Sequence, residues 1–317
     1  MTERETRATT AEAAPRTEVE IGGLRLRSPI MLASGVVGYG SEYADLLDLA
    51  SVGAIVTKTV TPRPRPGNRP PRLAETTSGL LNAIGLENVG IDAFVAEKLP
   101  EAAALGVPIV ASVAGETPGE FGGLAGAVGG RDEVAAVELN ISCPNVRRRR
   151  RPLWADPDGT ADLTRRAREA TAKPLFVKLS PSVADVESVA EAAADAGADA
   201  LVVANTIPGL RIELDTRRPA LGNATGGLSG AALLPVNLAL VWRVAAAVSI
   251  PIVGSGGIAG PDDAIEYFLA GASAVQVGTA LFRRPACTAT ILRGIEERLA
   301  AYGARSLSEI VGAARKE

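Results

Sequence analysis

The sequence predicts an α/β fold, a (β/α)₈ (TIM) barrel with an N-terminal hairpin and inserted loops at the C-terminal face of the barrel. Two observations carry this prediction: short apolar runs alternate with helical segments, and eight such units fit into about 250 residues, the usual size of this barrel. A doubly wound open sheet is the competing fold. It needs a glycine-rich GxGxxG turn after its first strand, and Ala33–Gly38 does not supply one.

The elements follow one another in a simple order along the chain. Residues 17–27 alternate apolar and polar side chains around Gly22-Gly23, which is typical of a short hairpin. Ser182 is the expected N-cap of one helix, and Gly197 is its expected end. We expect residues 1–16 to be a disordered tail and residues 17–317 to form one barrel domain. The eight apolar runs expected as barrel strands are 29–34, 54–60, 107–113, 135–142, 174–180, 200–206, 251–255 and 274–280.

One connection does not fit the simple alternation. Residues 61–90 contain prolines at 62, 64, 66, 70 and 71, so the segment is too long and too proline-rich for an ordinary link between strand and helix. We expect it to be an inserted loop over the mouth of the barrel.

Composition excludes several classes of protein. The net charge of -3 indicates no general nucleic-acid surface, and the polar N-terminus lacks the apolar core of a signal peptide or anchor, so we expect a cytoplasmic protein with no membrane contact. There is no histidine, which removes the commonest catalytic base and metal ligand, and we expect no metal site. Cys143 and Cys287 are too few to hold an iron–sulfur cluster, so any such cluster belongs to another chain.

Polar side chains gather where the predicted strands end. Catalytic residues of such barrels lie at the C-terminal ends of the strands, so these side chains are expected to converge. An asparagine amide matches the amide edge of a planar heterocycle, a lysine can meet a flavin carbonyl or a carboxylate, and exposed glycine N–H groups can cradle a phosphate. Each residue alone can equally be structural, and a lone cysteine can be a small core residue. The strand-end residues are Ser34, Lys58, Thr59, Asn140, Cys143, Lys178, Asn205, Thr206, Gly256, Gly257, Gly278 and Thr279, with Asn82 in the inserted loop.

Several long motifs occur in a fixed order along the chain. They are Val56–Pro62, Pro71-Arg72, Glu75-Thr76, Leu81–Leu86, Asn140–Asn145, Gly226–Gly230 and Gly254–Ile258. In these motifs, over about residues 18–300, the chain resembles class 1 dihydroorotate dehydrogenases of subclass B. The resemblance implies an FMN-containing barrel that oxidises dihydroorotate to orotate in pyrimidine biosynthesis.

The resemblance also assigns roles to individual residues. Cys143 corresponds to the base that removes the C5 proton while the C6 hydride passes to the flavin, and Lys58 is placed beside it in the catalytic set. The implied substrate-binding residues are Lys58, Asn82, Ala83, Ile84, Gly85, Leu86, Asn140, Asn145, Asn205 and Thr206. The implied FMN-binding residues are Ser34, Lys58, Thr59, Asn140, Lys178, Gly230, Gly256, Gly257, Gly278 and Thr279.

The subclass passes electrons to a partner subunit that carries FAD and an iron–sulfur cluster, and we expect a homodimer that can add this partner. Two positions depart from the family pattern. Ser112 stands where asparagine is usual, and Arg147–Arg151 with Pro152–Ala155 replaces a glycine-rich segment after Cys143. The arginine run is either a solvated loop or a contact to the substrate carboxylate or to an acidic partner surface.

Two other functions remain open at this point. One is a related FMN-dependent dihydropyrimidine oxidoreductase with an altered substrate. The other is a flavin-binding homologue without turnover.

Overall fold

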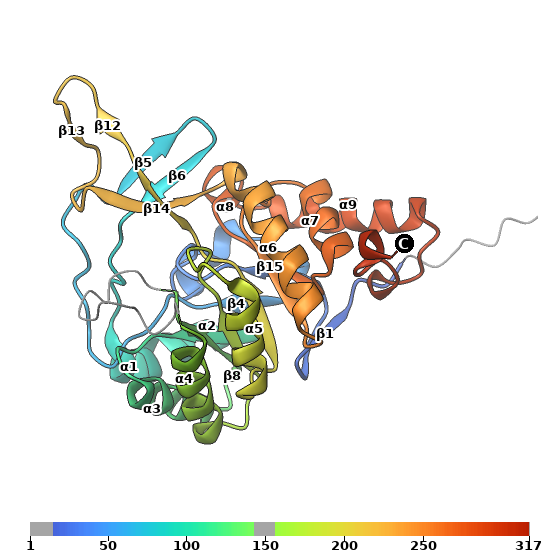
Figure 1. Ribbon diagram of the computed structural model, residues 1–317, viewed down its shortest axis with the longest axis horizontal. Coiled ribbons are helices and arrows are strands. Elements are labelled where there is room, and N and C mark those ends of the chain that lie inside the picture. Colours follow the sequence, from blue (N-terminus) through green and yellow to red (C-terminus); the bar gives the residue numbers. More distant parts are fainter. Residues whose placement is uncertain (1–14, 143–155, 317) are drawn as a thin grey trace, which may run out of the picture.

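The computed structural model describes residues 15–142 and 156–316. Helices surround a central barrel in Figure 1, and a β-sheet arm extends from one end. The barrel closes in the strand order β10-β15-β16-β3-β4-β7-β8-β9, and each strand pairs in parallel with its neighbours, which confirms the predicted (β/α)₈ barrel. The strands are β3 (Ile30–Leu32), β4 (Ala54–Val56), β7 (Ile109–Val113), β8 (Val134–Asn140), β9 (Leu175–Lys178), β10 (Ala200–Val203), β15 (Ile252–Ser255) and β16 (Ala274–Val277).

Helices connect most successive strands. The α5 helix begins at Val186, one residue after Asp185, whose carboxylate accepts a hydrogen bond from the Ser188 N–H at 3.1 Å. The prediction of Ser182 as N-cap was therefore wrong, because Asp185 makes the capping bond closer to the first buried residue. The helices are η1 (Ser41–Leu46), η2 (Leu49–Ser51), α1 (Gly90–Ala93), η3 (Phe94–Lys98), α2 (Leu99–Ala103), α3 (Pro118–Gly129), α4 (Pro157–Ala170), α5 (Val186–Asp195), η5 (Ala231–Leu233), α6 (Leu234–Ala247), α7 (Pro261–Ala270), α8 (Ala280–Arg283), α9 (Cys287–Ala301), η6 (Leu307–Glu309) and η7 (Ala313–Arg315).

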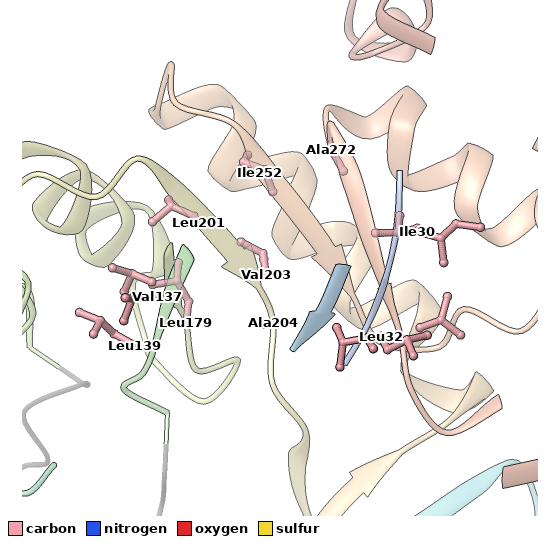
Figure 2. Packing of buried hydrophobic residues seen from close by; sticks show 14 of the residues in the cluster. Ile30, Leu32, Val137, Leu139, Leu179, Leu201, Val203, Ala204, Ile252 and Ala272 are labelled. Carbon is pink, nitrogen blue, oxygen red and sulfur yellow. The ribbon is translucent and has the colours of Figure 1, made fainter. Parts of the chain in front are cut away.

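Alternate residues of each barrel strand belong to different cores. Residues such as Ile30, Leu32, Val137 and Leu139 point outward and pack in the larger apolar cluster between strands and helices, part of which Figure 2 shows. The intervening residues point into the barrel, where side chains such as Phe176 form a smaller apolar cluster. This two-residue period places every second side chain of a strand in the barrel interior.

The predicted N-terminal hairpin closes the barrel at the N-terminal ends of its strands. Strands β1 (Val19–Ile21) and β2 (Leu24–Leu26) pair antiparallel around the Gly22-Gly23 turn. Ile21, Leu24 and Leu26 join the interior apolar cluster, so they fill the barrel at the N-terminal ends of its strands. The functional groups therefore lie at the opposite, C-terminal end of the strands.

The segment expected to be an inserted loop is more ordered than predicted. Strands β5 (Leu73–Thr76) and β6 (Gly79–Asn82) lie within it and join β14 (Thr225–Ser229) and β11 (Ile207–Leu210) in an antiparallel sheet ordered β11-β14-β6-β5. A smaller pair, β12 (Ile212–Glu213) and β13 (Arg218–Pro219), extends the arm seen in Figure 1. Sequence reasoning missed this sheet because its central pair, β6 with β14, joins segments 145 residues apart, and its strands are mostly half-exposed.

The ends of the chain add two observations. Arg16, which we expected in the tail, bridges to Ser306, and its N–H donates to the Arg305 carbonyl at 2.9 Å. Residues 1–14 lie outside the described part of the chain, and the division into a tail and one domain stays a prediction. None of the described helices is both long and apolar enough to cross a membrane.

Candidate active site

The upper interior of the barrel is polar, in contrast to the apolar layer below it. Asn140 is the last residue of β8 and Lys178 the last of β9, and the two are register partners. Ser112 is the last inward-facing residue of β7, Glu138 lies two residues before Asn140 on β8, and both are fully buried. Because parallel strands bring their C-terminal ends to one rim, these side chains share the mouth of the barrel. Of the four, Asn140 and Lys178 were expected there from the sequence.

Thr59 is the centre of one hydrogen-bond network at this mouth. Its hydroxyl lies 3.2 Å from Ser34 Oγ and 2.9 Å from Ser112 Oγ, and it accepts a bond from Asn140 Nδ2 at 3.0 Å. Ser34 also donates to the Thr57 carbonyl at 2.7 Å. The network brings together Ser34, Thr59 and Asn140 from three strands, and it gives Ser112 a partner that the sequence did not predict.

The asparagines of β8 and β10 meet on the other side of Asn140. Ser142 Oγ donates to Asn140 Oδ1 at 2.9 Å, and Asn205 Nδ2 lies 3.5 Å from the same oxygen. Asn205 also contacts Ser142, and its own Oδ1 accepts the Thr206 N–H at 2.8 Å. Asn140, Asn205 and Thr206 are thus adjacent, and their amides have fixed orientations.

Lys178 belongs to a buried chain of hydrogen bonds that joins the Thr59 network through Ser112. Its ammonium donates to Gln276 Oε1 at 2.9 Å, and Gln276 Nε2 donates to Glu138 Oε2 at 2.7 Å. Ser112 Oγ donates a hydrogen bond to the other carboxylate oxygen, Glu138 Oε1, at 3.5 Å. Sequence reasoning missed Glu138 and Gln276, although a charged or amide side chain at an inward position of an apolar run is a visible signal.

Lys58 lies in a different environment from Lys178. Its side chain is 27% exposed and its Nζ lies 3.7 Å from Glu87 Oε2. Arg72 donates to the same carboxylate at 2.9 Å. The Arg72 hydrogen bond, followed by the positive charge of Lys58, holds the pKa of the half-exposed Glu87 carboxyl below its usual range. Lys58 is therefore a cation with an exchangeable anionic partner.

The glycines that follow β15 and β16 have free backbone donors. Among the described residues, the N–H groups of Gly256, Gly257 and Gly278 donate to no other protein group. Gly256 and Gly257 have positive φ angles of 118° and 81°. A Cβ at Gly257 would lie 2.3 Å from the backbone nitrogen of Leu234, so only glycine fits there. Free N–H groups at the rim of a barrel suit a phosphate.

Gly230 and Thr279 are brought to this same part of the rim. Thr279 Oγ1 donates to Ser229 Oγ at 2.8 Å, next to Gly230. Asn237, a fully buried residue of α6, donates to the Ser255 carbonyl at 2.7 Å and so supports the Gly256-Gly257 turn from behind. Sequence reasoning did not single out Asn237.

The inserted sheet carries the remaining predicted substrate residues. Asn82, at the end of β6, donates to the Gly227 carbonyl at 3.2 Å. A Cβ at Gly227 would lie 2.2 Å from Thr206 Oγ1, which shows how closely this sheet approaches the end of β10. Gly85 and Leu86 both have positive φ, within the connection 83–86 that follows Asn82. Cys143, Asn145 and the Arg147–Arg151 run lie outside the described residues.

Comparison with known proteins identifies the family. A family model of dihydroorotate dehydrogenase matches residues 16–299. The chain belongs to the dihydroorotate dehydrogenase family. Family membership confirms the resemblance seen in the motifs, and it implies a flavin-dependent oxidoreductase.

Relatives similar over nearly the whole chain are named "dihydroorotate dehydrogenase B (NAD(+)), catalytic subunit". The protein of Geotalea daltonii is 50% identical over 301 residues, which cover 95% of this chain and 99% of the relative. That of Pelobacter propionicus is 50% identical over 299 residues, 94% and 98% of the two chains. That of Desulforudis audaxviator is 48% identical over 301 residues, 95% and 98% of the two chains. The name "catalytic subunit" implies that these relatives have a partner subunit.

Proposed function

We propose that this chain is the catalytic subunit of a dihydroorotate dehydrogenase of the B type, which oxidises dihydroorotate to orotate in pyrimidine biosynthesis. One observation carries the proposal most directly. Asn140, Asn205 and Lys178 lie together at the barrel mouth, and Cys143 follows Asn140 in the chain by three residues. Oriented amides, a cation and a thiol are the groups needed to hold a dihydropyrimidine ring and remove a proton from it.

FMN is the cofactor that this donor set fits. The free N–H groups of Gly256, Gly257 and Gly278, with Gly230 and Thr279 beside them, would hold its phosphate. Ser34, Lys58, Thr59, Asn140 and Lys178 would hold its ring system. When bound, FMN supplies the acceptor for the hydride that leaves C6 of the substrate.

Substrate binding falls to the opposite side of the mouth. Asn82, Asn140, Asn145, Asn205 and Thr206 offer amide and hydroxyl groups to the two amide edges of the pyrimidine ring. Lys58 would bind the carboxylate, because its cation is partly exposed and its present partner Glu87 can be exchanged. The connection formed by Ala83, Ile84, Gly85 and Leu86 would close over the same group.

Cys143 is the proposed base. A thiolate accepts the C5 proton as the C6 hydride leaves, so the C5–C6 bond becomes a double bond and the two electrons leave with the hydride. Cys143→Ser should slow flavin reduction by about 10²–10⁴-fold, the usual contribution of a general base. Cys287→Ser is the matched control, because Cys287 is buried at the start of α9, and burial raises the pKa of its thiol. Equal rates in both variants would remove Cys143 from this role.

The electrons would pass to a partner subunit that carries FAD and an iron–sulfur cluster. This subunit would bind to a homodimer of this chain in the cytoplasm. The names of the relatives, which contain both NAD(+) and "catalytic subunit", support this proposal. So does the sequence, whose two cysteines cannot ligate a cluster.

The test is anaerobic mixing of the purified protein with dihydroorotate while the flavin absorbance is recorded. We expect a yellow protein with noncovalent FMN that dihydroorotate bleaches and dihydrouracil does not. Bleaching by dihydrouracil alone would favour a related dihydropyrimidine oxidoreductase. A yellow protein that neither compound bleaches would be a flavin-binding homologue without turnover, and a protein that cannot be loaded with FMN would contradict the proposal altogether.

A further inference from the structure

The Lys178 network crosses the barrel from one wall to the other. Gln276 is on β16, Lys178 on β9 and Glu138 on β8. In the barrel order, β15 and β10 separate β16 from β9, while β3, β4 and β7 separate it from β8. Gln276 therefore spans the interior to reach both charged residues, at 2.9 and 2.7 Å.

Stability does not explain this arrangement well. Glu138 is 0% exposed, Gln276 1% and Lys178 5%. Removing two such charges from water costs several kcal/mol per ion, and well-packed apolar residues in their place are often as stable or more so. Neighbouring interior positions are apolar: Phe176 is the register partner of Glu138 and Val202 that of Lys178, which shows that this barrel can be filled with apolar side chains. The polar bridge is thus better explained by what it does at the mouth.

The order of the three groups has a chemical consequence. A carboxylate in direct contact with Lys178 would neutralise its charge locally, whereas Gln276 holds the carboxylate one side chain away. The ammonium has three N–H donors, of which Gln276 accepts one. The bridge fixes the position of the ammonium and leaves donors for a ligand at the mouth.

We propose that Gln276 and Glu138 are positioning residues that hold the Lys178 ammonium against the flavin ring and set how strongly its charge favours the reduced flavin. The inference rests on the proposed function, in which a flavin binds at this mouth. Glu138 supplies the counter-charge, and Gln276 keeps that charge at a distance. Neither residue needs to touch substrate.

The experiment compares the oxidation state of bound FMN in equilibrium with a reference dye, without substrate. Gln276→Glu places a carboxylate directly on Lys178, so the ratio of oxidised to reduced flavin at a given potential should rise about tenfold, equivalent to about 30 mV for a two-electron couple. Glu138→Gln keeps the shape and removes the negative charge, so the ratio should fall about tenfold. Ser51→Ala is the control, because it removes a buried hydroxyl pair with Thr288 away from the mouth and should leave the ratio unchanged.

Opposite shifts in the two variants support the proposal, and if one variant fails to fold, the sign of the other still decides. Ratios within twofold of wild type, or shifts in the same direction, would overturn it and assign the bridge to packing alone. A wild-type protein that binds no FMN would instead contradict the proposed function, and this inference with it. The two failures are therefore distinguishable from the same set of samples.

Discussion

The barrel strands and the inserted sheet supply functional groups to the same mouth in different ways. On the barrel side, Lys178 is 5% exposed and is held by Gln276 and Glu138, which are also buried. Lys58 also follows a barrel strand, two residues after β4, but it pairs with Glu87 of the inserted segment; their side chains are 27% and 45% exposed, and Lys58 Nζ lies 3.7 Å from Glu87 Oε2. The first cation is fixed in place, and the second is paired with an anion that another anion can displace.

This difference matches two kinds of ligand. A cofactor that stays bound through many turnovers benefits from donors whose positions are set in advance. A substrate carboxylate that enters and leaves in each turnover needs a cation that is accessible from solvent. We therefore expect Lys178 to act mainly in FMN binding, and Lys58, which also belongs to the proposed FMN set, to act mainly in orotate binding.

The largest difference should appear in stability. Lys178→Met removes the cation that Gln276 bridges to the buried Glu138 carboxylate, and leaving a buried charge uncompensated costs about 3–5 kcal/mol. Lys58→Met loses only a part-exposed ion pair, worth under about 1 kcal/mol. Urea unfolding followed by circular dichroism, with excess FMN in every sample, measures both free energies. Similar losses of unfolding free energy in the two variants would show that Lys178 is held no more firmly than Lys58.

FMN retention should distinguish two glycines with similar backbone angles. Gly257 and Gly303 have φ of 81° and 68°, but a Cβ at Gly257 meets the Leu234 nitrogen at 2.3 Å, whereas at Gly303 it meets nothing within 4 Å. An overpacked site typically costs 1–3 kcal/mol, so Gly257→Ala should weaken FMN binding by about 10- to 100-fold. Gly303→Ala is the matched control for backbone strain. Flavin fluorescence during FMN titration gives both affinities, and equal affinities would exclude the Gly257 turn from the phosphate site.

The smallest effect is expected on orotate affinity when Glu87 is substituted. Glu87→Gln removes the anion that competes for Lys58, so orotate should bind about two- to fivefold more tightly, and added salt should shrink the difference because both groups are part-exposed. Since the pKa of Glu87 is lowered, its carboxylate stays ionised to lower pH than an ordinary glutamate, and the competition is lost only as pH falls through the lowered pKa. Orotate affinity that is unchanged in the variant at low salt would show that Glu87 does not compete.

The sequence predicted the barrel side far better than the inserted side. Each barrel strand is a short apolar run, and the parallel order places residues such as Asn140 and Lys178 on one rim without any further information. The inserted sheet was missed because β6 pairs with β14, and no local pattern records a contact between Leu81 and Leu228. Nonlocal pairing of half-exposed strands leaves little periodicity to detect.

Within the site, sequence reasoning identified the residues at the strand ends and missed those one step below. Glu138 and Gln276 lie inside apolar runs, and whether such side chains point inward or toward the helices depends on strand register. Their contact across the barrel is a property of closure, which no single strand reveals. Lys58 and Lys178 were both predicted, but their different surroundings became visible only in three dimensions.

The division of labour between these two lysines is tested most directly by orotate titration of FMN-loaded wild type, Lys58→Met and Lys178→Met, followed by the flavin absorbance. Losing a charge-assisted contact costs about 1.5–3 kcal/mol, so Lys58→Met should weaken orotate binding by at least about tenfold. The flavin-loaded fraction of Lys178→Met should bind orotate within about twofold of wild type, since a contact to the ring of FMN leaves the substrate carboxylate untouched. Wild-type affinity in Lys58→Met, or an equal loss in both variants, would contradict the account.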